Sequence, residues 1–493
     1  MNHLEFDFRK KWNKENNLSR RSFFSRVSDG LCGAALTSLL SADLLSSSPI
    51  LALGKSQKIY DLKPKIPHFE PRAKSVIQLF MNGGPSQMDL FDPKPMLERY
   101  SGKPPGRDLA NDIEFTNEAG GFMPSPFQFS KHGESGIEVT DNLPHLAKRI
   151  DDIALIRSMF TTNFNHEPAI YIMQNGRMRD GRPPLGAWVV YALGTENQNL
   201  PSYVVLDDPI KLPTNHIQNW HSGWLPPLYQ GTRMRSEGSS MLNLEPQEKW
   251  PNPVTEVARS LLKGLDSSHR DQRSGYPNLD ARISNYELAA RMQLSASDAL
   301  DISQESDSTR EMYGLNDEIS SSYGRRCLMA RRLVERGVRM VQLYIEGQIW
   351  DTHSDLQKDL GYCCRKTDKP IAALLTDLKQ RGLLDSTLVV WGGEFGRLPL
   401  SQSRPGLGAG RDHNPQGFSV WMAGAGIKGG TVHGATDDVG YKATENKVSV
   451  HDFHATILHL LGMNHRKVIY QREGRNERLT DEFPARIVKE ILS

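Results

Sequence analysis

The chain has 493 residues, of which 38% are hydrophobic and 8% aromatic, so it can bury a large core. Its 60 basic and 58 acidic residues leave a net charge of +2, which argues against nucleic acid as the main partner, because proteins that track phosphates carry a basic excess. Beyond the N-terminal region no apolar run approaches the length of about 18 residues that a spanning helix needs, so we expect no membrane span in the mature chain.

The N-terminal region has the features of an export signal. Residues 19–24 read Ser-Arg-Arg-Ser-Phe-Phe, and a moderately apolar stretch follows from Leu31 to Leu53. This pattern is typical of a twin-arginine signal, although an amphipathic helix with a basic first turn is an alternative. Asp43 interrupts the apolar stretch and no clear cleavage site follows, so both removal and retention as an anchor stay open. We assign residues 1–54 to the signal and 55–74 to a linker, and we expect a periplasmic or extracellular location.

Beyond the linker, short apolar runs alternate with helical patterns. Apolar runs that end in turns predict buried strands at residues 75–81, 153–156, 203–206, 339–345, 387–392 and 418–422. Helical patterns are found at residues 143–149 (with Asp141 or Asn142 as the cap), 168–175 (closed by Gly176), 185–193, 371–381 and, as a long polar segment, 254–336. This alternation predicts an α/β fold with a mainly parallel central sheet and helices on both faces.

Candidate functional residues gather where the predicted strands end. Ligands bind beyond the carboxyl ends of the strands in such sheets. The residues near these ends are Asn82, Ser86 and Asp89 after the first strand, Asn165 and His166 after the second, then Asp351, His353, Glu394 and Arg397, and finally Asp412 and His413 ahead of the 418–422 strand. Carboxylates and neutral imidazoles bind divalent metals, and arginine complements an oxyanion.

Each of these residues also has a structural interpretation. Ser86 can simply close its turn, Asp89 can cap a helix or a turn, and a histidine in a loop is often structural. Convergence of several such groups from distant parts of the sequence on one edge of a sheet favours a metal site over these separate explanations.

Several segments together resemble a known family, and they are Asn82–Pro95, Asn165-His166 with Gly176-Arg177, Trp350–His353, Gly393–Arg397, Gly410–His413 and His451–Thr456. Their order, from about residue 75 to the C-terminus, resembles the exported, sulfatase-like family of the domain of unknown function numbered fifteen-oh-one. That family belongs to the alkaline phosphatase superfamily. The resemblance implies an alkaline phosphatase-like fold for residues 75–493, with 254–336 as its helical segment, and it implies no particular substrate.

The superfamily pattern implies roles for individual residues. Its nucleophile lies eleven residues before an arginine that follows a glycine, and counting back from Arg177 gives His166 in place of the usual serine, threonine or cysteine. The resemblance implies one metal held by Asp351, His353 and His413, with Glu394 completing that site or binding a second ion. Asn82 and Phe395 stand where the second site has ligands, so only one site is complete.

Together these observations predict a metal-dependent hydrolase of small-molecule or carbohydrate esters of sulfate or phosphate. A divalent ion (zinc, calcium and manganese are not distinguished) would neutralise charge on the ester. His166, at a helix N-terminus, is a candidate nucleophile, base or ligand, with Ser86 or Asp89 as alternatives, and Arg397 or Arg177 would hold a non-bridging oxygen. The rival is a non-catalytic metal- or ligand-binding module in an envelope protein assembly, because the usual nucleophile is absent.

The export prediction is tested by conservative substitution of the arginine pair. Arg20→Lys combined with Arg21→Lys should retain the protein in the cytoplasm, because the export receptor reads the pair itself and not its charge. Cell fractionation and immunoblotting measure this, and undiminished export of the double variant would rule out the twin-arginine route.

Overall fold

The structure is a computed structural model that describes residues 60–112, 120–237, 252–273, 277–402 and 408–493. The predicted signal region, 1–54, lies outside these residues. The chain divides into two compact units, one made of 1–60 with 243–283 and a larger one made of 61–242 with 284–493. Every candidate site residue belongs to the larger unit.

The larger unit is built on a nine-stranded sheet among its described residues. The order is β12(Thr431–His433), β4(Ile153–Phe160), β11(Phe418–Ala423), β8(Thr387–Gly392), β1(Ser75–Phe80), β7(Met340–Tyr344), β5(Tyr203–Leu206) and β6(Thr232–Met234), and β15(Val448–Ser449) also pairs with β4. Only β11 runs antiparallel to its neighbours β4 and β8. The mainly parallel α/β sheet predicted from the sequence is therefore confirmed.

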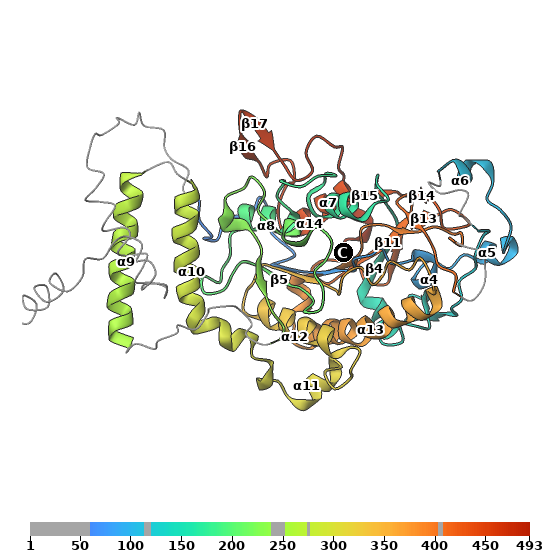
Figure 1. Ribbon diagram of the computed structural model, residues 1–493, viewed down its shortest axis with the longest axis horizontal. Coiled ribbons are helices and arrows are strands. Elements are labelled where there is room, and N and C mark those ends of the chain that lie inside the picture. Colours follow the sequence, from blue (N-terminus) through green and yellow to red (C-terminus); the bar gives the residue numbers. More distant parts are fainter. Residues whose placement is uncertain (1–59, 113–119, 238–251, 274–276, 403–407) are drawn as a thin grey trace, which may run out of the picture. The chain divides into compact units, whose positions relative to one another are not determined.

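The central strand β1 lies between β7 and β8, with Ile77 opposite Val341 on one side and Val389 on the other. All six of its residues are buried, as expected for a parallel strand covered on both faces. Helices α12(Ser321–Glu335) and α13(Leu356–Gln380) lie on one side of the sheet in Figure 1, and α7(His166–Asn175), α8(Leu185–Leu193) and α14(Val450–Leu460) lie on the other.

Three helix predictions differ from the structure at their starts. Helix α7 begins at His166, two residues before Pro168. Proline is tolerated there because the backbone N–H groups of a first helical turn have no acceptor within the helix, so the missing N–H of proline costs nothing. Helix α13 begins at Leu356 and continues through Pro370, whereas the sequence pattern predicts a helix that starts only at residue 371. The predicted helix 143–149 is instead a 3₁₀ helix, η1(Leu146–Asp152), which begins later because the Asp368 carboxylate accepts hydrogen bonds from the backbone N–H groups of His145 and Leu146 at 2.9 and 2.7 Å.

The long polar segment 254–336 forms several helices. They are α9(Asn252–Gln272), α10(Pro277–Leu300), η4(Ile302–Gln304), α11(Asp307–Met312) and α12, with α9 in the smaller unit and α11 and α12 in the larger one. A search of the described helices finds none with both the length and the apolar character needed to cross a bilayer.

A buried chain of polar side chains fixes α7 to the sheet. The Tyr203 hydroxyl donates a hydrogen bond to Gln342 Oε1 at 2.6 Å. Gln342 Nε2 in turn donates to Gln78 Oε1 on β1 at 3.1 Å and to Gln174 Oε1 on α7 at 2.8 Å. Because buried amides are costly to leave unpaired, this network holds α7, and with it His166, at a defined position over the sheet.

The buried ion pair between Asp208, just after β5, and Arg326 of α12 generates a stability prediction, since neither side chain is exposed. Replacing Arg326 with methionine leaves the carboxylate without its cation and should destabilise the larger unit by about 3–5 kcal/mol. Thermal unfolding measures the effect. The matched control is Arg325→Met on the same helix. The guanidinium of Arg325 is half-buried and pairs with no described residue, so its loss should lower the free energy of unfolding by less than about 1 kcal/mol. Equal melting temperatures for both variants would contradict the assignment.

Candidate metal centre

Four potential metal ligands meet at the carboxyl edge of the sheet. His166 is the first residue of α7, while Asp351 and His353 lie in the segment between β7 and α13. His413 begins β10(His413–Asn414), which pairs antiparallel with β9(Gly396–Arg397) after β8. Their ligand atoms all lie within 4.8 Å of one another. The structure thus brings together Asp351, His353 and His413, as the sequence led us to expect, and adds His166 to the same cluster.

The Nε2 atoms of the three histidines surround the Asp351 carboxylate. His353 Nε2 and His413 Nε2 lie 2.8 and 3.1 Å from Oδ1, and His166 Nε2 lies 3.2 Å from Oδ2. The Nε2 atoms of His353 and His413 are 3.0 Å apart. Four ligands placed about 2.1 Å from one ion in a tetrahedron are about 3.4 Å from each other, so the donor types and their spacing both fit a single metal ion.

Two of the histidines have their other ring nitrogen fixed by a neighbour. His166 Nδ1 lies 2.6 Å from Glu394 Oε1, and since a carboxylate only accepts, Nδ1 keeps its proton and Nε2 is the nitrogen that could bind a metal in place of a proton. His353 Nδ1 is bound in the same way by the amide oxygen of Gln402. Such outer partners are typical of histidine ligands, because they set the tautomer and the ring orientation.

The protonation equilibria of the cluster are strongly shifted without a metal. Burial opposes charge on Asp351, but hydrogen bonds with the three histidines hold the pKa of its carboxyl well below the usual range. Burial likewise opposes charge on His166, but hydrogen bonds with Asp351 and Glu394 raise its pKa to about 9. Burial lowers the pKa of His413 to about 4. The cluster therefore keeps one carboxylate charged and one imidazole neutral at neutral pH.

Glu394 lies beside the cluster and outside the group of four ligands. Its side chain is fully buried, and Oε1 also accepts a hydrogen bond from the Gly83 backbone N–H at 2.9 Å. Its Oε2 atom has no hydrogen-bond partner among the described residues. The structure gives Glu394 the role of orienting His166, which differs from its predicted role as a metal ligand.

The predicted role of Arg397 is corrected by its contacts. Its side chain is fully buried, and a guanidinium nitrogen lies 2.6 Å from Asp351 Oδ1. The remaining donors bind backbone carbonyls of Gly83, Gly84, Trp350 and Arg411. Because its side chain is not exposed and each of its nitrogens already contacts the protein, this arginine is placed to hold Asp351 and not to bind a substrate oxygen.

Ser86 and Asp89 form a separate buried group. The Ser86 hydroxyl donates to Asp89 Oδ2, and Arg411 donates to both oxygens of the same carboxylate at 2.7 and 3.1 Å. None of the three side chains is exposed. This arrangement does not favour Ser86 or Asp89 as an alternative nucleophile, because both groups are enclosed and committed to a buried ion pair.

The Asn82 side chain is committed to the backbone next to the sheet. Its amide donates to the Ile345 carbonyl at 3.0 Å and accepts from the Ile345 N–H at 3.2 Å, so it continues the pairing of β1 with β7. An aspartate there would lack the donor. Phe395, at the other position where a second site would have a ligand, packs on the rings of His166 and His413, with centroids 4.8 and 4.6 Å away. The residues present do not fit a second ion.

The other candidate residues are placed around the cluster. Asn165 is the N-cap residue of α7 and makes no side-chain cap hydrogen bond. Asp412 Oδ1 lies 3.9 and 4.0 Å from the Nδ1 atoms of His353 and His413. Arg177 pairs with Asp481 and covers the ring of Phe483 at 4.4 Å, so its guanidinium is directed at the C-terminal segment and not at the cluster.

Gln402 and Arg411 are supporting residues that sequence reasoning did not assign. Arg411 stood in a recognised motif, but its partner Asp89 is 322 residues away. No local pattern marks Gln402. Gly83 lies in the turn after β1 and has a φ of +114°. A Cβ at this position would lie 2.6 Å from the Asp351 backbone nitrogen. Only glycine therefore allows the loop after β1 to approach the loop that carries Asp351.

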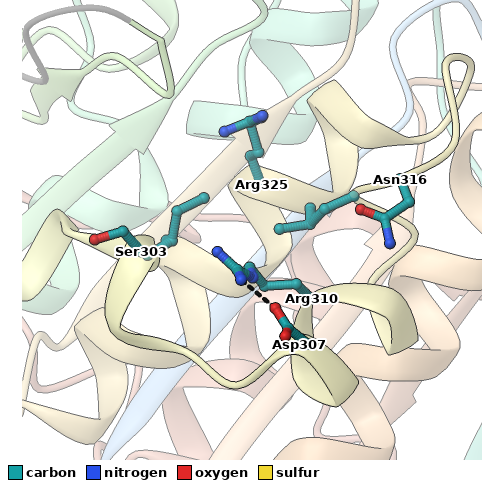
Figure 2. Close-up of a pocket in the computed structure, with 7 residues that line it drawn as sticks. Ser303, Asp307, Arg310, Asn316 and Arg325 are labelled. Carbon is teal, nitrogen blue, oxygen red and sulfur yellow. Dashed lines mark hydrogen bonds and ion pairs between the residues drawn. The ribbon is translucent and has the colours of Figure 1, made fainter.

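A pocket of about 400 Å³ is formed elsewhere in the larger unit, by η4, α11 and α12 (Figure 2). Within it Arg310 forms an ion pair with the exposed Asp307, and Arg325 lies on the opposite wall. It contains none of the metal-cluster residues. The candidate site is therefore identified by its four potential metal ligands, and this pocket is not part of it.

Comparison with known proteins gives a family and no activity. The family model DUF1501, described as a protein of unknown function, matches residues 73–492. No curated protein matches the chain at a significant level. Among solved structures, the lipoteichoic acid synthase LtaP from Listeria monocytogenes aligns with a TM-score of 0.36 and 9% identity over 82% of this chain and 76% of that one.

Two further structures align at a similar level. The phosphonate monoester hydrolase SpPMH from Silicibacter pomeroyi has a TM-score of 0.34 and 10% identity over 71% of each chain. The alkaline phosphatase from the Antarctic bacterium TAB5 has a TM-score of 0.29 and 10% identity over 79% of this chain and 98% of that one. The assignment of the site rests on the geometry above and not on these alignments.

Metal content tests the cluster directly. We expect the isolated protein to bind about one divalent ion per chain, and His166→Ala, His353→Ala and His413→Ala each to lower the occupancy, because each removes one of four donors. Elemental analysis after gel filtration measures this. His145→Ala, which removes an exposed histidine at the start of η1, should keep full occupancy. Equal metal in all five proteins would exclude these residues from the site.

Proposed function

We propose that this chain, which belongs to the DUF1501 family, is a metal-dependent hydrolase of phosphate or sulfate esters whose site holds one ion through His166, Asp351, His353 and His413. The observation that carries the proposal is the convergence of three imidazole Nε2 atoms on one carboxylate, at the edge of the sheet where α/β proteins bind ligands. The cluster is accessible, since the side chain of His353 is 34% exposed.

The donor set favours a transition-metal ion. Three nitrogens and one carboxylate suit zinc, manganese or iron, whereas calcium takes six to eight oxygen ligands. When bound, such an ion would supply a Lewis acid for the oxygens of the ester. The three nitrogen ligands support a proposal of zinc, manganese or iron in preference to calcium.

Protein groups prepare the site for an anionic ester. Glu394 holds the proton of His166 on Nδ1, and Arg397 holds Asp351 against the loop after β1. The α7 N-terminus, whose N-cap Asn165 makes no side-chain cap bond, directs its first backbone N–H groups and its dipole at the same place. These groups favour binding of a negatively charged oxygen beside the cluster.

The geometry favours His166 as a ligand over His166 as a nucleophile. Its Nδ1 proton is held by a buried carboxylate, and its Nε2 faces the Asp351 carboxylate within the cluster. With no serine, threonine or cysteine at this helix start, we propose that water is the attacking group and that no covalent intermediate forms on the chain.

The rival function is a metal-binding module without turnover. The observation that favours it is the number of donors, because four protein ligands are typical of closed structural zinc sites, whereas catalytic sites keep an open position. Under either function we propose that the protein is exported by the twin-arginine route to the periplasm or beyond.

Turnover distinguishes the two functions. The protein loaded with zinc, manganese or iron should hydrolyse an aryl phosphate, a phosphodiester or an aryl sulfate, and His166→Ala should lower kcat/KM by about 100-fold or more, because an incomplete ligand set weakens both the binding and the orientation of the ion. The matched control is His132→Ala on the hairpin β2(Phe129–His132)–β3(Ile137–Thr140), which should keep the parent rate. Stoichiometric metal without turnover of any of these esters would favour the binding module.

A further inference from the structure

Several large apolar side chains are exposed beside the segments that carry the metal cluster. Met178, Ile210, Ile217 and Phe483 are 54%, 68%, 53% and 41% exposed. We call these four residues the apolar rim. All of them lie in loops or in a short turn, where binding residues are common.

Ile210 and Ile217 belong to the loop between β5 and β6, which contacts both sides of the cluster. The Asn215 amide donates a hydrogen bond to the carbonyl of Glu167, the residue after His166, at 2.9 Å. The Gly347 N–H, in the segment leading to Asp351, donates to the Lys211 carbonyl at 3.2 Å. The loop therefore touches the two segments that supply three of the four ligands, His166, Asp351 and His353.

This loop is held in one conformation. Asn215 and His216 are consecutive non-glycine residues with φ of 69° and 45°, a combination that persists only where the surroundings impose it. At its start the Ile210 N–H donates to Asp208, whose carboxylate is paired with buried Arg326. The exposure of its two isoleucines is thus a property of a fixed surface.

Met178 and Phe483 contact the segments that flank α7, the helix that begins with His166. Met178 Sδ lies 3.6 Å from the Asn163 amide nitrogen, in the loop that leads into His166. Phe483 stacks on His451 at 4.0 Å and under the Arg177 guanidinium at 4.4 Å, and His451 lies 3.0 Å from the Gly176 carbonyl. Both side chains are therefore tied to the segments at the two ends of α7.

We infer that the apolar rim binds the alcohol portion of the substrate, so that the preferred substrates are phosphate or sulfate esters of apolar aryl or alkyl alcohols. The inference rests on the proposed function. Fixed apolar surface next to a site for an anion gains free energy when an apolar group attached to that anion covers it. The contacts of the β5–β6 loop with the segments that carry His166 and Asp351 argue for this occupant over a second copy of the chain or a partner protein.

Phosphonates test the inference without turnover, because their carbon–phosphorus bond is not an ester. Titration calorimetry of the metal-loaded protein should give an affinity for octylphosphonate about ten-fold or more above that for methylphosphonate, since several methylenes leave water. Ile210→Ser with Ile217→Ser should reduce this ratio to about three-fold or less. The matched control, Ile66→Ser, replaces an isoleucine that is 95% exposed on the segment ahead of β1 and should keep the ratio of the parent.

A second pair of substitutions, Met178→Ser with Phe483→Ser, repeats the test on the other two residues of the apolar rim and is informative if the first pair fails to fold. Equal affinity for the two phosphonates overturns the inference and leaves the proposed function standing. Binding of neither one contradicts the proposed function, and the inference with it. Self-association that the Ile210→Ser, Ile217→Ser protein loses, with an unchanged phosphonate ratio, would assign the rim to a second copy and overturn the inference.

Discussion

The ion pair between Asp351 and the buried guanidinium of Arg397 is the interaction on which the candidate site depends. It places a charged carboxylate, 2.6 Å from a fully buried cation, at the point where three histidines converge. The same guanidinium also binds carbonyls from the loops after β1, after β7 and before β10. One buried charge therefore ties together loops from distant parts of the sequence, and it is tolerated because each of its nitrogens has a hydrogen-bond partner and a carboxylate balances its charge.

This arrangement explains why we propose a single ion for the site. Positions where the superfamily pattern places ligands of a second metal are occupied by Asn82, which completes the pairing of β1 with β7, and by Phe395, which packs on the cluster. Glu394 remains, but its carboxylate is turned to His166 and to the Gly83 N–H. In the structure, the residues at the positions of the second site contact the backbone of β7 or the histidines of the first site.

The sequence predicts the parts of the molecule that depend on local pattern. Strand β8 and helix α8 have their predicted bounds because an apolar run and its turns are sufficient to define them. The candidate ligands Asp351, His353 and His413 could be named because their residue types are restricted, they follow strand ends, and the family resemblance implies them. The roles of Arg397, Ser86 and Asp89 could not be found in this way, because burial and choice of partner are set by contacts over hundreds of residues, such as Arg411 with Asp89. Gln402 lies in no motif, so only the fold reveals that it orients His353.

The central claim is that His166 is a direct ligand of the metal and that Glu394 orients it. A crystal structure of the metal-loaded protein, with anomalous data collected at the absorption edge of the bound ion, tests this most directly. The account predicts one anomalous peak about 2.0–2.2 Å from the Nε2 atoms of His166, His353 and His413 and from an Asp351 oxygen, with Glu394 still on His166 Nδ1. A peak bound to Glu394, with His166 outside the coordination sphere, would contradict the account.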